Sequence, residues 1–116
     1  MTREKRVREV TKSLGMGIEI IGDFHSHTQI GKSKAVPIPS SEDLLTMSEG
    51  RIYLIVALNW KRGRLSWRTN SDGTLSGTLW DFHIKIGAYT IFNDEIKRLT
   101  VICPVATGFL PIRRKR

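Results

Sequence analysis

Two kinds of hydrophobic spacing divide the chain into a short helical start and a longer part that favours strands. Val7, Val10 and Leu14 recur at intervals of three and four residues, which is typical of one face of a helix. We therefore expect a helix over residues 4–14. The β-branched residues that follow are too few for a second helix, so residues 18–25 predict a strand that ends where two histidines begin.

The middle of the chain is dominated by the continuous apolar run Ile52–Leu58, which has the length and composition of a strand buried on both faces. Before it, glycine, prolines and lysines predict a loop over residues 28–39, and a capping pattern predicts a helix from Ser40 to about Ser48. Beyond the run we expect a turn at 61–64, after which residues 65–69 pair back onto the apolar strand as a hairpin arm. A second turn is expected at 70–73. It is followed by one or two half-buried strands within 78–92 and a terminal strand within 96–103.

These elements predict an α/β fold with a mixed sheet flanked by helices, in one domain over residues 1–112 with a basic tail at 113–116. A chain of 116 residues can bury a core without covalent cross-links, and its one cysteine, Cys103, cannot form an internal disulfide. No apolar run approaches the roughly 20 residues that span a bilayer. We therefore expect a cytoplasmic protein with no membrane partner.

The positions of the charged residues along the sequence do not indicate a nucleic-acid-binding protein. The formal net charge is +8, and four of the 19 basic residues form the tail, so 15 basic against 11 acidic residues leave +4 elsewhere. Basic residues near the start alternate with Glu4 and Glu9, as on a solvated helix face. The sequence has no DNA-reading motif and no aromatic-rich platform for single strands, so specific nucleic-acid binding is not expected.

The most informative polar residues are His25 and His27. In an extended chain, residues two positions apart point to the same face, with their Cα atoms about 6.5–7 Å apart. Two imidazoles in that arrangement can bind one metal ion. This pair taken alone is equally consistent with two exposed polar residues at a strand end.

Ser40 and Asp43 stand at the start of the predicted helix. As structural residues they form an acidic variant of a capping box. As functional residues, Asp43 adds a carboxylate ligand to the two histidines and Ser40 lies beside a metal-bound water. The two interpretations are compatible, because capping would hold the carboxylate in place. Two histidines and one carboxylate leave a fourth tetrahedral position for water, as in hydrolytic zinc sites, although such ligands also accept iron, cobalt or manganese.

The order and local spacing of these residues resemble the JAMM (MPN-plus) metalloprotease motif, which is His-x-His followed by Ser-x-x-Asp. The resemblance covers residues 17 to about 60 and implies an MPN-like fold in which His25, His27 and Asp43 bind Zn2+. Ser40 would be a catalytic residue that helps to stabilise the tetrahedral intermediate. The resemblance also implies hydrolysis of isopeptide or peptide bonds to ubiquitin-like proteins, so the partner would be a ubiquitin-like conjugate or a protein tail.

The sequence departs from that family's pattern in three ways. Thr28 stands where the family usually has proline, and the loop before Ser40 is longer than usual. The family's general base is a glutamate on a preceding strand, and Glu4, Glu9 and Glu19 do not match its place. Two interpretations follow. The chain is an N-terminally shortened version of a longer protein that lacks the family's first strands, or it binds metal without the usual base.

Two other functions stay open. Asp23-Phe-His-Ser-His-Thr28 also resembles the opening motif of the PHP phosphoesterases, but these enzymes need further ligands along a much longer barrel, and only His83 remains. The other function is a non-catalytic, metal-bearing scaffold that docks partners through its surface and basic tail. The absent glutamate favours the scaffold.

The other residues of chemical interest have structural interpretations. His83 is expected to be an exposed strand residue, and Cys103 a buried small hydrophobe. The three tryptophans are expected to pack in the core or against hairpins: Trp60, Trp67 and Trp80.

Overall fold

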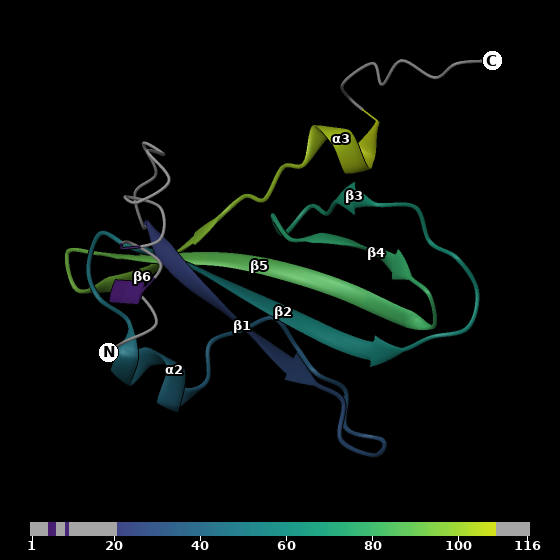
Figure 1. Cartoon of the computed structure of the whole chain (residues 1–116), viewed down its shortest axis with the longest axis horizontal. Coiled ribbons are helices and arrows are strands. Elements are labelled where there is room, and N and C mark those ends of the chain that lie inside the picture. Colours follow the sequence, from purple (N-terminus) through teal and green to yellow (C-terminus); the bar gives the residue numbers. More distant parts are fainter. Residues whose placement is uncertain (1–4, 7–8, 10–20, 109–116) are drawn as a thin grey trace.

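The computed structural model describes residues 5–6, 9 and 21–108, and their secondary structure is dominated by one mixed sheet (Figure 1). The sheet has six strands, and within residues 21–108 two short helices lie at its margins. The strands are β1 (Gly22–Thr28), β2 (Ile52–Trp60), β3 (Arg68–Thr69), β4 (Leu75–Leu79), β5 (Phe82–Phe92) and β6 (Glu95–Leu99), and the helices are α2 (Ser41–Thr46) and α3 (Pro104–Thr107). The predicted α/β class with a mixed sheet is confirmed, whereas the MPN-like form of that fold stays a prediction.

The sheet has the strand order β1-β2-β5-β4-β3, and β6 pairs with β5 off this path. Its strand pairs are antiparallel except for β1 and β2, which are parallel. A parallel pair needs a crossover connection, and here the loop after β1 together with α2 provides it. The crossover brings α2 back beside β1 (Figure 1), which places the start of this helix near the two histidines.

The core lies mainly on one face of β2. Along this strand, buried side chains alternate with half-buried ones, and the buried ones are Tyr53, Ile55, Ala57 and Asn59. Ile55 is completely inaccessible to solvent. The prediction that this strand is buried on both faces is therefore wrong for one face, along which the side chains are only half-buried.

The strand that carries the histidines extends further than expected. The sequence predicts that it ends at about His25, but β1 continues to Thr28. The reason is its partner: β1 and β2 stay in parallel register up to the pair Thr28 and Leu58. Both histidines therefore lie within a paired strand, which fixes their backbone more firmly than a strand end would. Residues 18–20 of the predicted strand lie outside the described residues.

Only part of the predicted helix over residues 4–14 is described. Lys5, Arg6 and Glu9 are helical, and the other residues of that segment lie outside the described ones, as does the basic tail 113–116. None of the helices in the described part of the chain has the length and apolar character needed to cross a membrane.

The second half of the chain corrects one predicted pairing. The arm expected at 65–69 does not pair back onto β2, because β5 occupies that edge of β2 and β1 occupies the other. Only Arg68 and Thr69 form a strand, and they pair with β4. The region 78–92 contains the end of one strand and the whole of another, joined by a turn at Trp80 and Asp81.

The tryptophans also differ from expectation. Trp67 does pack against a hairpin: a Cβ atom at Gly77 would lie 2.3 Å from the Trp67 ring, so only glycine allows the indole to lie on β4. Trp60 and Trp80, in contrast, are 62% and 84% exposed. The prediction of core or hairpin packing is wrong for these two residues.

Candidate metal centre

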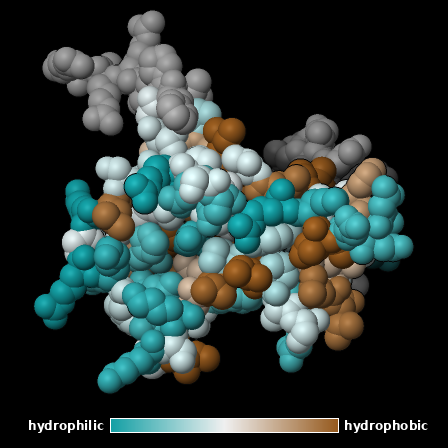
Figure 2. All heavy atoms as spheres, turned by 180° about the vertical axis from the view of Figure 1, so that it is seen from behind, coloured by the Kyte–Doolittle hydropathy of each residue, from teal (hydrophilic) through white to brown (hydrophobic). Residues whose placement is uncertain are grey.

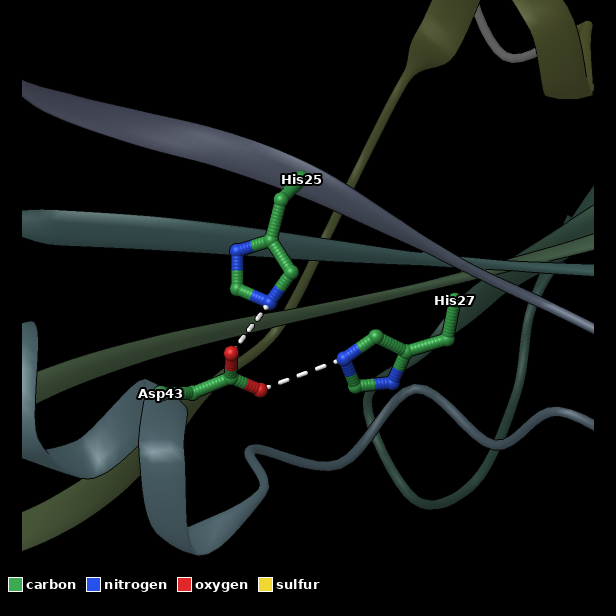
Figure 3. A group of neighbouring side chains, drawn as sticks. All are labelled: His25, His27 and Asp43. Atoms are coloured by element: carbon green, nitrogen blue, oxygen red, sulfur yellow. Dashed lines mark hydrogen bonds and ion pairs between the residues drawn. The ribbon is translucent and has the colours of Figure 1, made fainter.

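The capping interaction at the start of α2 holds Asp43 in place. The Asp43 backbone N–H donates to Ser40 Oγ (3.1 Å), and the Ser40 backbone N–H donates to Asp43 Oδ2 (2.7 Å). This is the reciprocal capping box expected from the sequence. Because one carboxylate oxygen is bonded to the helix start, the side chain has little rotational freedom, and its other oxygen, Oδ1, points toward β1 (Figure 3).

His25 and His27 approach the same carboxylate from β1. They are paired with Ile55 and Ala57 of β2, so their side chains are on the sheet face that carries the buried core. His25 Nε2 lies 2.9 Å from Asp43 Oδ1, and His27 Nε2 lies 3.1 Å from Asp43 Oδ2 (Figure 3). The structure therefore brings together the three residues that were predicted from the sequence as metal ligands.

The second ring nitrogen of His27 reveals how this imidazole is oriented. Its Nδ1 atom is 3.1 Å from the carbonyl oxygen of Val36. A carbonyl oxygen can only accept, so this contact assigns the proton to Nδ1 and, in the neutral ring, leaves the lone pair on Nε2. That lone pair faces an oxygen of Asp43. Two acceptors at this distance repel one another unless a proton or a metal cation lies between them.

His25 presents a similar mismatch. Its Nε2 atom is buried and makes no hydrogen bond in the described part of the chain, although Asp43 Oδ1 is only 2.9 Å away. The pair is close enough for an ion pair but does not have hydrogen-bond geometry. A buried polar atom without a partner is uncommon in proteins and often marks a missing ion or water. A cation between the ring nitrogen and the carboxylate would satisfy both groups.

The crossover loop that carries Val36 is itself anchored to the sheet. Asn59 exchanges two hydrogen bonds with the backbone of Ala35, at 2.8 and 3.0 Å, and the Tyr89 hydroxyl donates to the carbonyl of Pro37. Both side chains are buried. A Cβ atom at residue 87 would lie 2.7 Å from that same carbonyl, so Gly87 permits the close approach.

Sequence reasoning missed this anchoring. Two residues indicate it in the sequence, because a polar group within a buried strand needs a hydrogen-bond partner. They are Asn59, which directly follows the apolar run, and Tyr89, whose hydroxyl lies within a strand predicted to be half-buried. Neither signal reveals its partner, because the loop backbone that each one binds is 24 or 52 residues away along the chain.

The electrostatics favour a charged Asp43. Burial opposes ionisation of this carboxylate, but hydrogen bonding by the Ser40 backbone and side chain, together with the nearby His25 ring, outweighs it and lowers the pKa of Asp43 from 3.8 to about 2. The group is therefore an anion at neutral pH, as a metal ligand must be. Its side chain is 16% exposed, against 40% for His25 and 25% for His27, so the group remains open to solvent on one side.

The donor set fits a divalent transition metal. One nitrogen or oxygen from each of His25, His27 and Asp43 lies within 4.8 Å of the others, and no other such group occurs among the described residues. Two imidazoles and a carboxylate are ligands that zinc accepts at about 2.0–2.2 Å. The Val36 contact adds the backbone carbonyl that commonly orients a metal-binding histidine through its other nitrogen. This arrangement can hold a metal ion, and it does not by itself identify which one.

The remaining candidate residues lie elsewhere. His83 is half-buried in β5, so the prediction of an exposed residue is wrong. Burial lowers its pKa, as do the nearby positive charges of lysine and arginine side chains. Cys103 is half-buried just before α3 rather than fully buried. Glu4 and Glu19 lie outside the described residues, and Glu9 is exposed.

Comparisons of the chain with protein-family models, curated proteins and solved structures find no match. The resemblance to the JAMM motif therefore depends on the residues of the metal centre alone.

Proposed function

We propose that this chain is a zinc-dependent metallopeptidase domain of the JAMM type, which hydrolyses isopeptide or peptide bonds to ubiquitin-like proteins. The observation that carries the proposal is the convergence of His25, His27 and Asp43 from two separate elements, with one buried ring nitrogen lacking a hydrogen-bond partner. The single Cys103 fits a reducing compartment, so the proposal includes a cytoplasmic location.

In this proposal the chain's own residues prepare the site before substrate arrives. His27 keeps its Nε2 lone pair directed inward because Nδ1 donates to Val36, and Asp43 is held ionised by Ser40. When bound, the metal would polarise the scissile carbonyl and lower the pKa of water, which is the chemistry that hydrolysis needs. The ligands come from a paired strand and a capped helix, so the geometry requires little reorganisation on binding.

Ser40 has two roles in the proposal. It caps α2 and thereby positions Asp43. Its hydroxyl lies next to the carboxylate, at the edge of the metal centre, where it would donate a hydrogen bond to the carbonyl oxygen as negative charge develops during hydrolysis. The first role is a geometric fact of the fold, and the second is a hypothesis carried over from the motif.

A second candidate function is a metal-bearing scaffold without catalysis. The observation that favours it is that no further carboxylate joins His25, His27 and Asp43 among the described residues. A missing general base typically lowers rate by about 10²–10⁴-fold. The scaffold and the peptidase share the metal centre, so only an activity measurement separates them.

The decisive experiment follows cleavage of a lysine-linked ubiquitin-like conjugate, with product release read on a gel. The chain is purified, its metal content is measured, and the assay is run with and without a chelator. If its gene encodes an in-frame upstream extension with a glutamate, the extended protein is assayed alongside. We expect one equivalent of zinc and chelator-sensitive cleavage that the Asp43→Ala variant loses. Asp81→Ala, which changes an exposed aspartate outside the metal centre, should leave cleavage unchanged.

Each outcome has a definite meaning. One equivalent of bound zinc without cleavage by either form of the protein supports the scaffold and rejects the peptidase. Two or three bound metals would reject both, since they would point to a multinuclear phosphoesterase site. Absence of any bound transition metal under saturating zinc would reject the metal centre itself.

A further inference from the structure

A second group of chemically distinctive residues lies where β2 ends and β5 begins. Trp60 closes β2 and Phe82 opens β5, and the two are paired in register. Their rings stack with centroids 4.5 Å apart and planes inclined by 29°. The stack is not a core contact, because Trp60 remains 62% exposed. Trp80, in the turn directly before β5, is 84% exposed. We call these three residues the aromatic end of the sheet.

The backbone at Trp80 is unusual for its residue type. This tryptophan has φ = 55°, in the left-handed region that bulky side chains rarely occupy. The other tight turn of β5 uses Asn93 and Asp94 at φ values of 52° and 61°, and these residue types tolerate that conformation. Folding alone would therefore favour asparagine or glycine at residue 80. A strained backbone that exposes a large aromatic ring indicates a role in binding.

Positive charge surrounds this end of the sheet. A surface hollow of about 380 Å³ is lined by Trp60, Lys61, Arg62 and Asp81. Among the residues that the structure describes, no carboxylate lies within 4 Å of the charged groups of Lys61 or Arg62. Unpaired cations beside the exposed indole ring of Trp60 are suited to a ligand that is both anionic and aromatic.

Positive charge also extends to the core face of the sheet, on which His83 lies because its partner Asn59 is buried there. The pKa of His83 is lowered first by burial and then by the positive charges of Lys61, Lys85, Lys34 and Arg68. Four cations from four different segments therefore lie near one side chain of β5. Figure 2 shows the molecule from behind, where apolar groups stand among hydrophilic ones rather than forming one continuous apolar face.

We propose that the aromatic end binds single-stranded nucleic acid without strong sequence preference. Bases would stack on Trp60 and Trp80, and phosphates would contact Lys61 and Arg62. This combination of stacking surfaces with unpaired cations is what sequence-tolerant single-strand binding requires. An acidic protein segment could form ion pairs with the cations, but it would have no bases to stack on the two indole rings. A single-stranded nucleic acid accounts for both the cations and the exposed rings.

This surface is separate from the metal centre. Trp60 is three residues beyond Ala57, the partner of His27, so its side chain points to the opposite face of the sheet. The proposal therefore does not depend on the proposed peptidase activity. It also departs from the expectation drawn from the sequence, which showed no aromatic-rich platform for single strands and placed Trp60 and Trp80 in the core or against hairpins.

The test uses the full chain and a fluorescein-labelled oligo(dT) of about 15 nucleotides, a length within the range that one small domain covers. We expect saturable binding with quenching of tryptophan fluorescence. Trp80→Asn should weaken binding by about 5- to 100-fold, the loss of one stacked base, while keeping the fold, because asparagine tolerates the left-handed backbone. Phe92→Ala is the matched control, since it removes an exposed aromatic ring, 58% accessible, from the other end of β5.

A second pair of variants separates the platform from the basic tail. Lys61→Gln with Arg62→Gln should lower the slope of log affinity against log salt by about 1.4, the value for two phosphate contacts on a single strand. Arg113→Gln with Arg114→Gln removes the same charge from the tail. We expect this tail variant to keep the tryptophan quenching and its dependence on Trp80.

Three results would overturn the proposal. If oligo(dT) does not bind even at low salt, single-stranded nucleic acid is excluded as the ligand. Binding that survives Trp80→Asn unchanged but disappears in the tail variant assigns the interaction to the tail. Equal competition by poly-glutamate, with the same loss in Trp80→Asn, identifies the occupant as an acidic protein segment instead.

Discussion

The metal centre and the aromatic end of the sheet are built by opposite means. In the metal centre each ligand is held by another group: His27 by the carbonyl of Val36, and Asp43 by the backbone of Ser40. At the aromatic end, Trp80 is 84% exposed and sits on a strained turn. One region positions its side chains through hydrogen bonds, whereas the other presents them to solvent at a cost to the fold.

This difference predicts how each region responds to substitution. Residues of the metal centre take part both in the fold and in ligand binding, so their loss should weaken both. Trp80 opposes the local backbone preference, so its replacement should weaken binding and strengthen the fold.

The largest effect is expected for loss of a metal ligand. His25→Ala should lower zinc affinity by more than the roughly 10–100-fold that loss of an outer-sphere partner produces, because it removes one of three protein ligands. Titration calorimetry with zinc measures this change. His83→Ala is the matched control, as it removes the histidine that lies outside the metal centre. Equal losses of zinc affinity in both variants would contradict the assignment of His25 as a metal ligand.

The next effect concerns the capping residue. Ser40→Ala removes the acceptor for the Asp43 backbone N–H, which should lower the free energy of unfolding by about 1 kcal/mol and zinc affinity by about 10-fold. Urea unfolding and zinc titration measure the two quantities. Ser41→Ala, one residue into the helix, should change neither by as much. A loss of stability without a loss of zinc affinity would mean that capping does not position the ligand.

The third prediction concerns the strained turn. Trp80→Asn should raise the free energy of unfolding by about 1 kcal/mol, because it relieves a left-handed conformation that costs a bulky residue about 1–2 kcal/mol. The reverse change, Asn93→Trp in the other turn of β5, should lower stability by a similar amount. Thermal unfolding of both variants provides the comparison. A destabilised Trp80→Asn would show that the exposed ring contributes to the fold after all.

The smallest effect is the pH dependence contributed by His83. Its pKa is lowered in the folded chain, so below its ordinary value of 6.5 the unfolded chain binds more protons, and stability falls as the pH falls through that value. In His83→Gln the difference in stability between pH 7.5 and pH 5.5 should therefore shrink, by less than about 1 kcal/mol for a half-buried group. Urea unfolding at the two pH values measures it. An unchanged or larger difference would contradict the assignment.

Several elements could be read from the sequence because local patterns determine them. The capping box of Ser40 and Asp43 depends on residues three apart, and the apolar run from Ile52 forms a strand as expected. Pairing was harder to predict. The segment 65–69 was expected to return to β2, but β5 pairs with β2 over nine residues, from Ile52 to Trp60, and a longer partner displaces a short arm.

The sequence by itself determined which residue types are available for a metal: two histidines at strand spacing, followed by a serine and an aspartate at helix-cap spacing. Only the tertiary structure decided that His25, His27 and Asp43 meet, because the crossover between parallel strands brings the helix start back across the sheet. The same holds for the aromatic end, where Trp60 and Phe82 are neighbours through strand register alone. Local order follows from short-range sterics and hydrogen bonding, whereas contacts between distant segments depend on which strands pair.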